Sequence, residues 1–187
     1  MRPPSEQTLE MLLKSFKLPT FAREYATVGA TAAREGLTHP AYLLALARLE
    51  AHERADRRTQ RLLEESRLPK EKSLTSFDLS RLSPKARTSF NALKDGAFLD
   101  RAENVLAFGN PGTGKTHLLC ALGQELVRNG RTVLFAPTFQ LVQRLLAAKR
   151  DLRLPSELKK LDRFDALLLD DIGYVQQSRE EMEVLFT

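Results

Sequence analysis

The chain contains a glycine-rich stretch whose residue types and spacing could bind phosphate: VLAFGNPGTGKTHLL, residues 105–119. Gly109, Gly114, Lys115 and Thr116 fill the fixed positions of the Walker A pattern. Glycines let backbone N–H groups turn inward around phosphate oxygens, and the N-terminus of the helix that follows adds partial positive charge. Lys115 is expected to reach the β- and γ-phosphates, and Thr116 to ligate Mg²⁺. The residues predicted to contact ATP are Gly109, Asn110, Pro111, Gly112, Thr113, Gly114, Lys115, Thr116 and His117.

Two adjacent carboxylates, Asp170 and Asp171, follow an apolar run at residues 166–169 and match the Walker B pattern. Asp170 is expected to hold Mg²⁺ directly or through water, and Asp171 to orient the attacking water near the γ-phosphate. Such a pair can also simply cap a strand, but the glycine-rich loop upstream favours chemistry, because neighbouring carboxylates need a cation. The candidate catalytic residues are Lys115, Asp170 and Asp171, and the candidate Mg²⁺ ligands are Thr116 and Asp170.

Alternating strands and helices are predicted to position these residues. Apolar runs without polar alternation, joined by helical crossovers, indicate a parallel α/β sheet with helices on both faces, as in P-loop NTPases. The predicted strands are residues 105–108, 133–136 and 166–171, and the predicted helices are residues 115–129, 139–150 and 156–161. Ser178 and Glu181 form a capping box for one more helix. Three strands with an unfinished crossover predict a fold that is incomplete at the C-terminus, as in a fragment.

Residues 1–68 are predicted to form a small all-helical domain, because no strand pattern occurs there. A first helix is capped by Ser5, a second runs from Thr20 to about Val28, and a third begins at Thr38. Four apolar residues share one face of the first helix: Leu9, Leu12, Leu13 and Phe16.

A linker is predicted at residues 69–83, anchored to the next domain by Phe77 and Leu79. Ser83 and Pro84 then begin a helix, and residues 84–187 are predicted to form the N-terminal part of an ATPase core.

The 187 residues carry a net charge of +5, with 42% hydrophobic and 28% charged residues. These values are typical of a globular protein, and the mild positive charge is compatible with an anionic partner such as nucleic acid. The single cysteine, Cys120, excludes an intrachain disulfide framework and suits a reducing cytosol. No apolar run is long enough to span a membrane, and the N-terminus lacks the apolar core of a signal peptide. We therefore expect a cytoplasmic protein without membrane association.

Three stretches together resemble the IstB-like helper ATPases of bacterial insertion sequences: FGNPGTGKTHLL, TVLFAPTFQLVQRLL and LLLDDIGYVQQSREEMEVLF. These helpers are AAA+ proteins of the initiator and helicase-loader clade, similar to DnaC and DnaA. The strings GNPGTGKTHL and LDDIG are the most specific part of the resemblance, which covers residues 74–187 well. The helical N-terminus is also similar to the N-terminal domain of that family, although its motifs are less specific.

The resemblance implies an ATP-dependent regulator of DNA transposition. Such proteins form homo-oligomers on duplex target DNA when ATP is bound, and recruit or stimulate a partner transposase. ATP would lie at the boundary between subunits, where a neighbour's arginine completes the site. Asp171 stands where many AAA+ proteins have glutamate, which implies slow hydrolysis. The sensor strand, the arginine finger and the helical lid of the family would lie beyond Thr187.

Two sets of basic residues are candidates for DNA contact, through phosphates rather than bases. The first shares one helix face, where interleaved acidic residues leave a solvated, internally paired face as the alternative. The second lies between the last two predicted strands, where the resemblance implies an inserted helix that faces DNA; a subunit interface or solvent exposure is the alternative. The sets are Arg54, Arg57, Arg58 and Arg61, and Lys149, Arg150, Arg153, Lys159, Lys160 and Arg163.

Other residues predict little chemistry. His117 and Cys120 follow the loop on its helix, where packing is the expected role, and His39 and His52 have no paired metal ligands. Tyr174 is expected to pack, with contact to a neighbouring subunit as the alternative.

Three alternative functions would share the nucleotide residues. A helicase loader similar to DnaC would bind a replicative helicase through its N-terminal domain. A small-molecule P-loop kinase is disfavoured by the paired aspartates, the basic insertion and the helical N-terminus. A nucleotide-binding module without turnover stays open because the predicted fold is incomplete.

Overall fold

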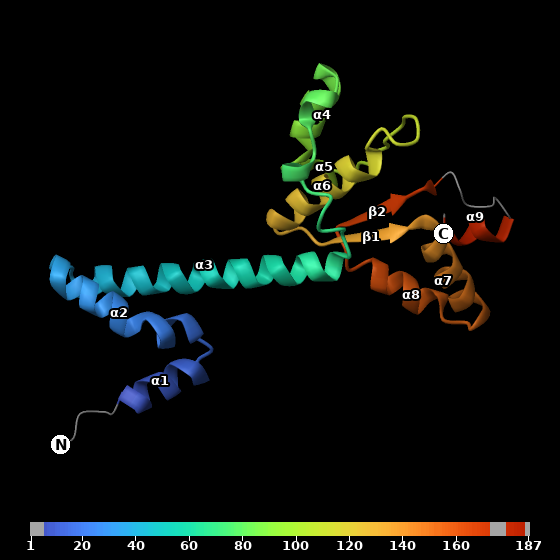
Figure 1. The fold of residues 1–187 in the computed structure, drawn as a ribbon. Coiled ribbons are helices and arrows are strands. Elements are labelled where there is room, and N and C mark those ends of the chain that lie inside the picture. Colours follow the sequence, from blue (N-terminus) through green and yellow to red (C-terminus); the bar gives the residue numbers. More distant parts are fainter. Residues whose placement is uncertain (1–5, 173–178, 186–187) are drawn as a thin grey trace. The chain divides into compact units, whose positions relative to one another are not determined.

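The computed structural model describes residues 6–172 and 179–185, and these residues are mostly helical (Figure 1). The chain divides into two compact units, Met1–Arg58 and Thr59–Thr187. The division falls within the helix α3 (His39–Ser66), whose end lies close to the boundary that the sequence predicts at residue 68. Within the described ranges, no helix is both long enough and apolar enough to cross a bilayer.

The first unit consists of α1 (Glu6–Ser15), α2 (Pro19–Glu35) and the first part of α3. The helix α2 extends past the predicted end near Val28, because Gly29 stays helical with the ring of Tyr42 packed against it. It ends at Gly36, whose left-handed backbone (φ 65°) directs its N–H to the carbonyl of Ala32. Thr38 precedes α3 as predicted, and Ser5 lies outside the described residues.

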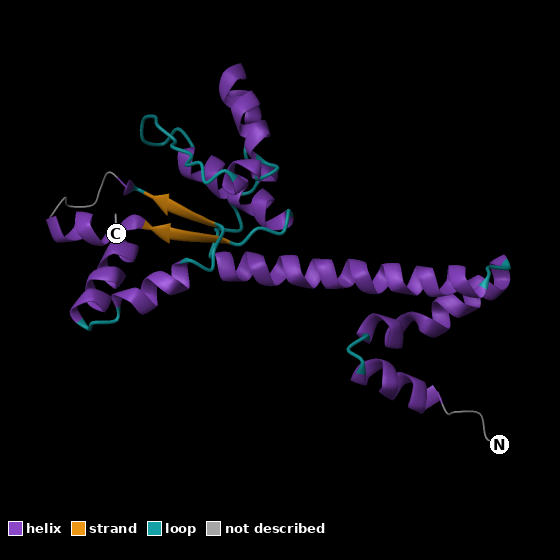
Figure 2. Ribbon diagram, turned by 180° about the vertical axis from the view of Figure 1, so that it is seen from behind, coloured by secondary structure: helices purple, strands orange, loops and turns teal. Residues whose placement is uncertain are grey.

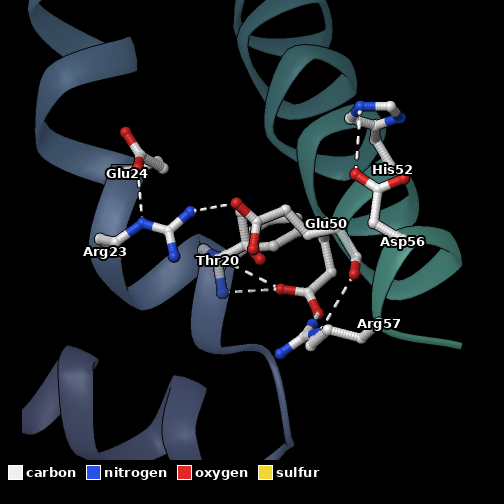
Figure 3. A network of polar contacts seen from close by, with 9 residues as sticks. Thr20, Arg23, Glu24, Glu50, His52, Asp56 and Arg57 are labelled. Atoms are coloured by element: carbon white, nitrogen blue, oxygen red, sulfur yellow. Dashed lines mark hydrogen bonds and ion pairs between the residues drawn. The ribbon is translucent and has the colours of Figure 1, made fainter. Parts of the chain in front are cut away.

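A buried carboxylate joins α2 to α3 (Figure 3). Glu50 Oε2 accepts hydrogen bonds from the backbone N–H groups of Thr20 at 2.9 Å and Phe21 at 3.4 Å. Both N–H groups lie in the first turn of α2, where a helix provides no backbone acceptor for them, and the N-cap residue supplies no side-chain acceptor. Arg54 Nε donates to Glu50 Oε1 at 2.8 Å. Burial raises the pKa of Glu50, but the hydrogen bonds from Arg54 and the α2 backbone outweigh it, so the pKa is lowered overall.

The second unit contains the parallel pair β1 (Val133–Pro137) and β2 (Ala166–Asp170), side by side in Figures 1 and 2. Val133 pairs with Ala166, and Pro137 with Asp170. Thr132 and Asp165 fix this register where the strands begin: the Thr132 N–H and hydroxyl donate to Asp165 Oδ2 at 2.7 and 2.9 Å, and the Asp165 N–H donates to the Thr132 hydroxyl at 2.9 Å.

Helices cover both faces of this pair, as the sequence predicts. Successive strand residues point to opposite faces, so Val133 and Phe135 pack in one cluster and Leu134 and Ala136 in the other. The first cluster includes α6 (Lys115–Arg128), and the second includes side chains of α7 (Thr138–Arg150), α8 (Leu154–Leu161) and α9 (Arg179–Leu185).

The predicted buried strand at residues 105–108 is wrong in this structure. These residues are irregular, and the side chains of Leu106 and Phe108 are 73% and 86% exposed. A strand is stabilised by hydrogen bonding to a neighbour, and in the described residues β1 and β2 pair only with each other. An apolar run is therefore insufficient to make residues 105–108 a strand.

Short elements occupy the predicted linker and the segment after it. They are the 3₁₀ turns η1 (Leu74–Ser76) and η2 (Leu79–Arg81), and the helices α4 (Pro84–Leu93) and α5 (Ala97–Asp100). The helix α4 begins as predicted, because the Ser83 hydroxyl accepts from the N–H of Ala86 at 3.2 Å. Leu79 packs against the α6 cluster, so the linker is anchored to the second unit.

Candidate nucleotide site

The glycine-rich loop leads directly into α6. Gly112 and Gly114 have φ angles of 75° and 89°, a left-handed conformation that residues with a Cβ rarely adopt. Gly114 is the N-cap residue of α6, and its carbonyl accepts the helical N–H of Leu118 at 2.9 Å. The loop therefore ends at the positive end of the helix dipole, where an anion is stabilised.

Two side chains of the loop converge on the carbonyl of Asn110. Lys115 Nζ donates to this oxygen at 2.9 Å, and the Thr113 hydroxyl donates to it at 2.8 Å. The ammonium group is thus held at the loop by a backbone carbonyl of the loop itself.

A hydrogen bond joins the loop to the acidic end of β2. The Thr116 hydroxyl donates to Asp170 Oδ1 at 2.8 Å, and both side chains are half-buried. The carbonyl of Asp170 accepts from the hydroxyl of Thr138, which is 1% exposed at the start of α7. A hydroxyl and a carboxylate are hard oxygen ligands of the kind that Mg²⁺ prefers, so these residues fit Mg²⁺ bound with nucleotide phosphates.

Asp171 lies just beyond the strand and has a left-handed backbone with a φ of 57°. Aspartate tolerates this conformation better than most residues because its short side chain can bond locally. Its side chain is exposed, whereas that of Asp170 is half-buried against Thr116. The two carboxylates thus have different surroundings, as different roles would require.

His117 contacts the linker. Its Nε2 lies 3.1 Å from the carbonyl oxygen of Ser73, and its ring packs edge-on against Phe77 with the centroids 5.1 Å apart. The sequence predicts Phe77 only as a surface anchor; its position beside the loop depends on packing that no local pattern reveals.

Cys120 is fully buried, and burial raises the pKa of its thiol to about 11, so it stays protonated near neutral pH. His52 Nε2 lies 3.4 Å from Asp56 Oδ2 on the same helix (Figure 3). The described residues contain no group of three or more histidine, cysteine or acidic side chains that could hold a metal ion. Tyr174 and Ser178 lie outside the described residues.

The arginines of the first candidate set for DNA contact differ in how they are bonded. Arg54 Nη2 donates to the carbonyl of Lys17 at 2.5 Å in addition to its bond with Glu50, and Arg57 Nη2 lies 3.5 Å from the same carboxylate. Arg61 lies 3.8 Å from Glu65, whereas Arg58 is exposed and makes no ion pair with any described residue. Part of the set therefore has a structural role in the first unit.

The second candidate set lies on α7, α8 and their flanks. Lys149 pairs with Glu183 at 2.9 Å, Arg153 with Asp151 at 2.5 Å, and Lys160 with Glu157. Three exposed members form no ion pair in the part of the chain that the structure describes: Arg150, Lys159 and Arg163.

Comparison with known proteins identifies relatives over almost the whole chain. A family model described as "IstB-like ATP binding protein" matches residues 11–187. A protein of Sinorhizobium fredii (strain NBRC 101917 / NGR234) is 41% identical over 182 residues, which are 97% of this chain and 61% of the relative. A Pseudomonas aeruginosa protein is 35% identical over 178 residues, 95% of this chain and 67% of the relative. A Geobacillus stearothermophilus protein is 28% identical over 169 residues, 90% of this chain and 67% of the relative.

All three relatives bear names that assign them to insertion sequences as ATP-binding proteins; the second and third name IS21 and IS5376. The chain thus spans between 61% and 67% of the length of these relatives.

Proposed function

The chain belongs to the family of IstB-like ATP-binding proteins, and from this premise we propose that it is an ATPase that serves DNA transposition. It binds ATP with Mg²⁺ at residues 109–117, forms homo-oligomers on duplex DNA with ATP between subunits, and stimulates a partner transposase. The names of its relatives, which combine ATP binding with insertion sequences, support this proposal.

The observation that carries the proposal is the 2.8 Å contact between the Thr116 hydroxyl and the Asp170 carboxylate. It unites the phosphate loop and the acidic strand end, which are far apart in sequence, in a single oxygen-rich site. These two residues would hold Mg²⁺, which supplies positive charge against the phosphate oxygens. Lys115 would bind the terminal phosphates, and Asp171 would orient a water for attack on the γ-phosphate.

DNA contact would come from the exposed basic residues of the candidate sets that form no ion pair with a described residue, namely Arg58, Arg150, Lys159 and Arg163. Contacts with phosphates make binding independent of base sequence and strongly weakened by salt. ATP-dependent binding of duplex DNA in large complexes is the expected result. ATP-independent binding as monomers would contradict the proposed oligomer.

Asp171→Asn tests the chemistry. Loss of the carboxylate is expected to lower the rate of ATP hydrolysis about 100-fold or more, since a positioned base contributes at least that factor, while ATP affinity changes little. Hydrolysis by the unsubstituted chain and by the Asp162→Asn control, which changes another exposed carboxylate of the same unit, should be equal. Unchanged turnover in Asp171→Asn would refute the role of Asp171. The proposed role in transposition is tested by measuring whether the chain stimulates DNA strand transfer by a partner transposase.

A further inference from the structure

The linker is hydrogen bonded to the helix that follows the phosphate loop. His117 Nε2 lies 3.1 Å from the carbonyl oxygen of Ser73 and 3.2 Å from the hydroxyl oxygen of Ser76. A carbonyl oxygen only accepts, so Nε2 must carry the proton and donate it. Gln124, seven residues further and on the same face of α6, donates to the carbonyls of Pro69 at 2.9 Å and Lys72 at 3.2 Å. The linker therefore runs along α6 and is hydrogen bonded to it at two positions, His117 and Gln124.

The linker also reaches the last glycine of the loop. Cε2 of Phe77 lies 3.1 Å from the position that a Cβ on Gly114 would occupy, so the ring packs directly on that backbone. The same ring meets His117 at an interplanar angle of 66°, an edge-to-face arrangement that aromatic pairs favour. Phe77 is thus wedged between the N-cap residue of α6 and the imidazole one turn along the helix.

The short turn that carries Phe77 has its own bonds. The Ser73 N–H donates to the Ser76 hydroxyl at 3.1 Å, and that hydroxyl lies 2.5 Å from the carbonyl of Glu71. The Phe77 N–H donates to the carbonyl of Leu74 at 3.4 Å. These bonds make residues 71–77 a defined turn, which can transmit a constraint to the loop.

We propose that residues 73–77 are a positioning element for the phosphate loop, acting through Phe77 and His117; this inference rests on the proposed nucleotide site. Gly114 must hold a left-handed φ of 89° to direct the N–H groups at the start of α6 toward phosphate. Glycine has no side chain that restricts its backbone, so packing from outside fixes the conformation. A loop held in advance loses less conformational entropy when it binds its ligand.

The coupling works in both directions. If the linker favours the phosphate-binding form of the loop, a bound nucleotide must stabilise the linker by the same free energy. Nucleotide binding therefore orders the segment between α3 and α4.

Substitutions at the two contact residues test the proposal, with ATP affinity measured by titration calorimetry and stability measured by thermal unfolding. Phe77→Ala is expected to weaken ATP binding about tenfold, because part of the binding free energy must then be used to order the loop. His117→Phe retains a ring but no donor, and His117→Gln retains a donor but no ring. Each should weaken binding by about threefold, and the double loss in His117→Ala by more.

Val142→Ala is the matched control. Val142 is fully buried in the cluster on the opposite face of the sheet, so this variant lowers the melting temperature without touching the linker. Its ATP affinity should remain that of the unsubstituted chain. Equal affinity losses in Val142→Ala and Phe77→Ala, or no loss in Phe77→Ala, would overturn the proposal.

Hydrogen exchange gives the reciprocal measurement. ATP should slow exchange at the amides of Ser76 and Phe77, which are bonded within the turn, and leave α8 unchanged. In Phe77→Ala the slowing at Ser76 should be lost, even at saturating ATP. If ATP binds but linker exchange does not respond, the inference is wrong and the nucleotide site stands. If the unsubstituted chain binds no ATP, the proposed function fails, and the inference with it.

Discussion

The two units differ in how much apolar surface they bury: Thr59–Thr187 has an apolar cluster on each face of its strands, whereas the described part of Met1–Arg58 buries few apolar side chains and, beside them, the carboxylate of Glu50. Glu50 is 4% exposed, yet Phe16 and Leu43 are 67% and 58% exposed. Among the described residues of the first unit, the buried apolar side chains are Ala22, Ala32 and Leu46.

This contrast indicates that the two units have different sources of stability. The second unit has an apolar cluster on each face of its strands, so burial of apolar area stabilises it. The described part of the first unit buries one leucine and two alanines, so the bonds of Glu50 should contribute a larger share of its stability. The residues of the proposed nucleotide site belong to the second unit, and we expect ATP binding to survive damage to the first.

Leu46→Ala should have the largest effect on the stability of the first unit relative to the second. Leu46 is 2% exposed, and removal of a fully buried leucine side chain costs about 3 kcal/mol. We expect α1 and α2 to lose protection against hydrogen exchange, while ATP affinity stays the same. A parallel loss of ATP binding would show that the units are not independent.

Lys115→Ala should lower ATP affinity and leave stability unchanged, which is the opposite of the result expected for Leu46→Ala. Removal of the ammonium deletes charge-assisted hydrogen bonds to phosphate, and ATP affinity should fall about 100-fold. The melting temperature without nucleotide should change little, because Lys115 bonds only to its own loop among the described residues. Calorimetric titration and thermal unfolding measure the two quantities. An unchanged affinity would count against the loop as the phosphate site.

Glu50→Gln should destabilise the first unit by about 2 kcal/mol, because the amide keeps an acceptor for α2 but loses the charge that Arg54 needs. Glu53→Gln is the matched control on the same helix. Glu53 pairs with Arg23 at the surface, and this substitution should cost less than about 0.5 kcal/mol. Helix content during chemical unfolding measures the difference, and equal effects of the two substitutions would refute the special role of the buried carboxylate.

Acid should have the smallest effect, and in the first unit it should act through Glu50. The pKa of Glu50 is lower in the folded chain than its ordinary value of 4.5. Its stabilisation is therefore complete above the ordinary value and is lost as the pH falls through the lowered one. The protection factors for hydrogen exchange at the start of α2, which compare the measured rates with the intrinsic rates at each pH, should fall below pH 5 in the unsubstituted chain and change less in Glu50→Gln. The same acid response in both chains would contradict this assignment.

Local patterns in the sequence predict most of the elements that surround the site. The end of α6 and the start of α4 depend on residues within one turn, Gly130 and Ser83, so short motifs reveal them, whereas α2 extends past its predicted end near Val28. The Walker A and Walker B patterns assign Thr116 and Asp170 to one Mg²⁺ ion, and their side chains lie within 2.8 Å of each other although residues 105–108 form no strand.

Long-range contacts were not predictable in the same way. The bonds of Glu50 join residues about thirty positions apart, and Phe77 reaches Gly114 from a separate segment. Residues 105–108 show the reverse case: their apolar composition predicts a strand, but a strand also needs a neighbour with which to pair.

The bond from Lys115 to the carbonyl of Asn110 has a consequence for how this side chain can be perturbed. The oxygen engages one of the three N–H donors of the ammonium group, so two donors remain for a ligand. Because the acceptor belongs to the backbone, no side-chain substitution at position 110 deletes it. The orientation of the lysine is thus encoded in the path of the main chain.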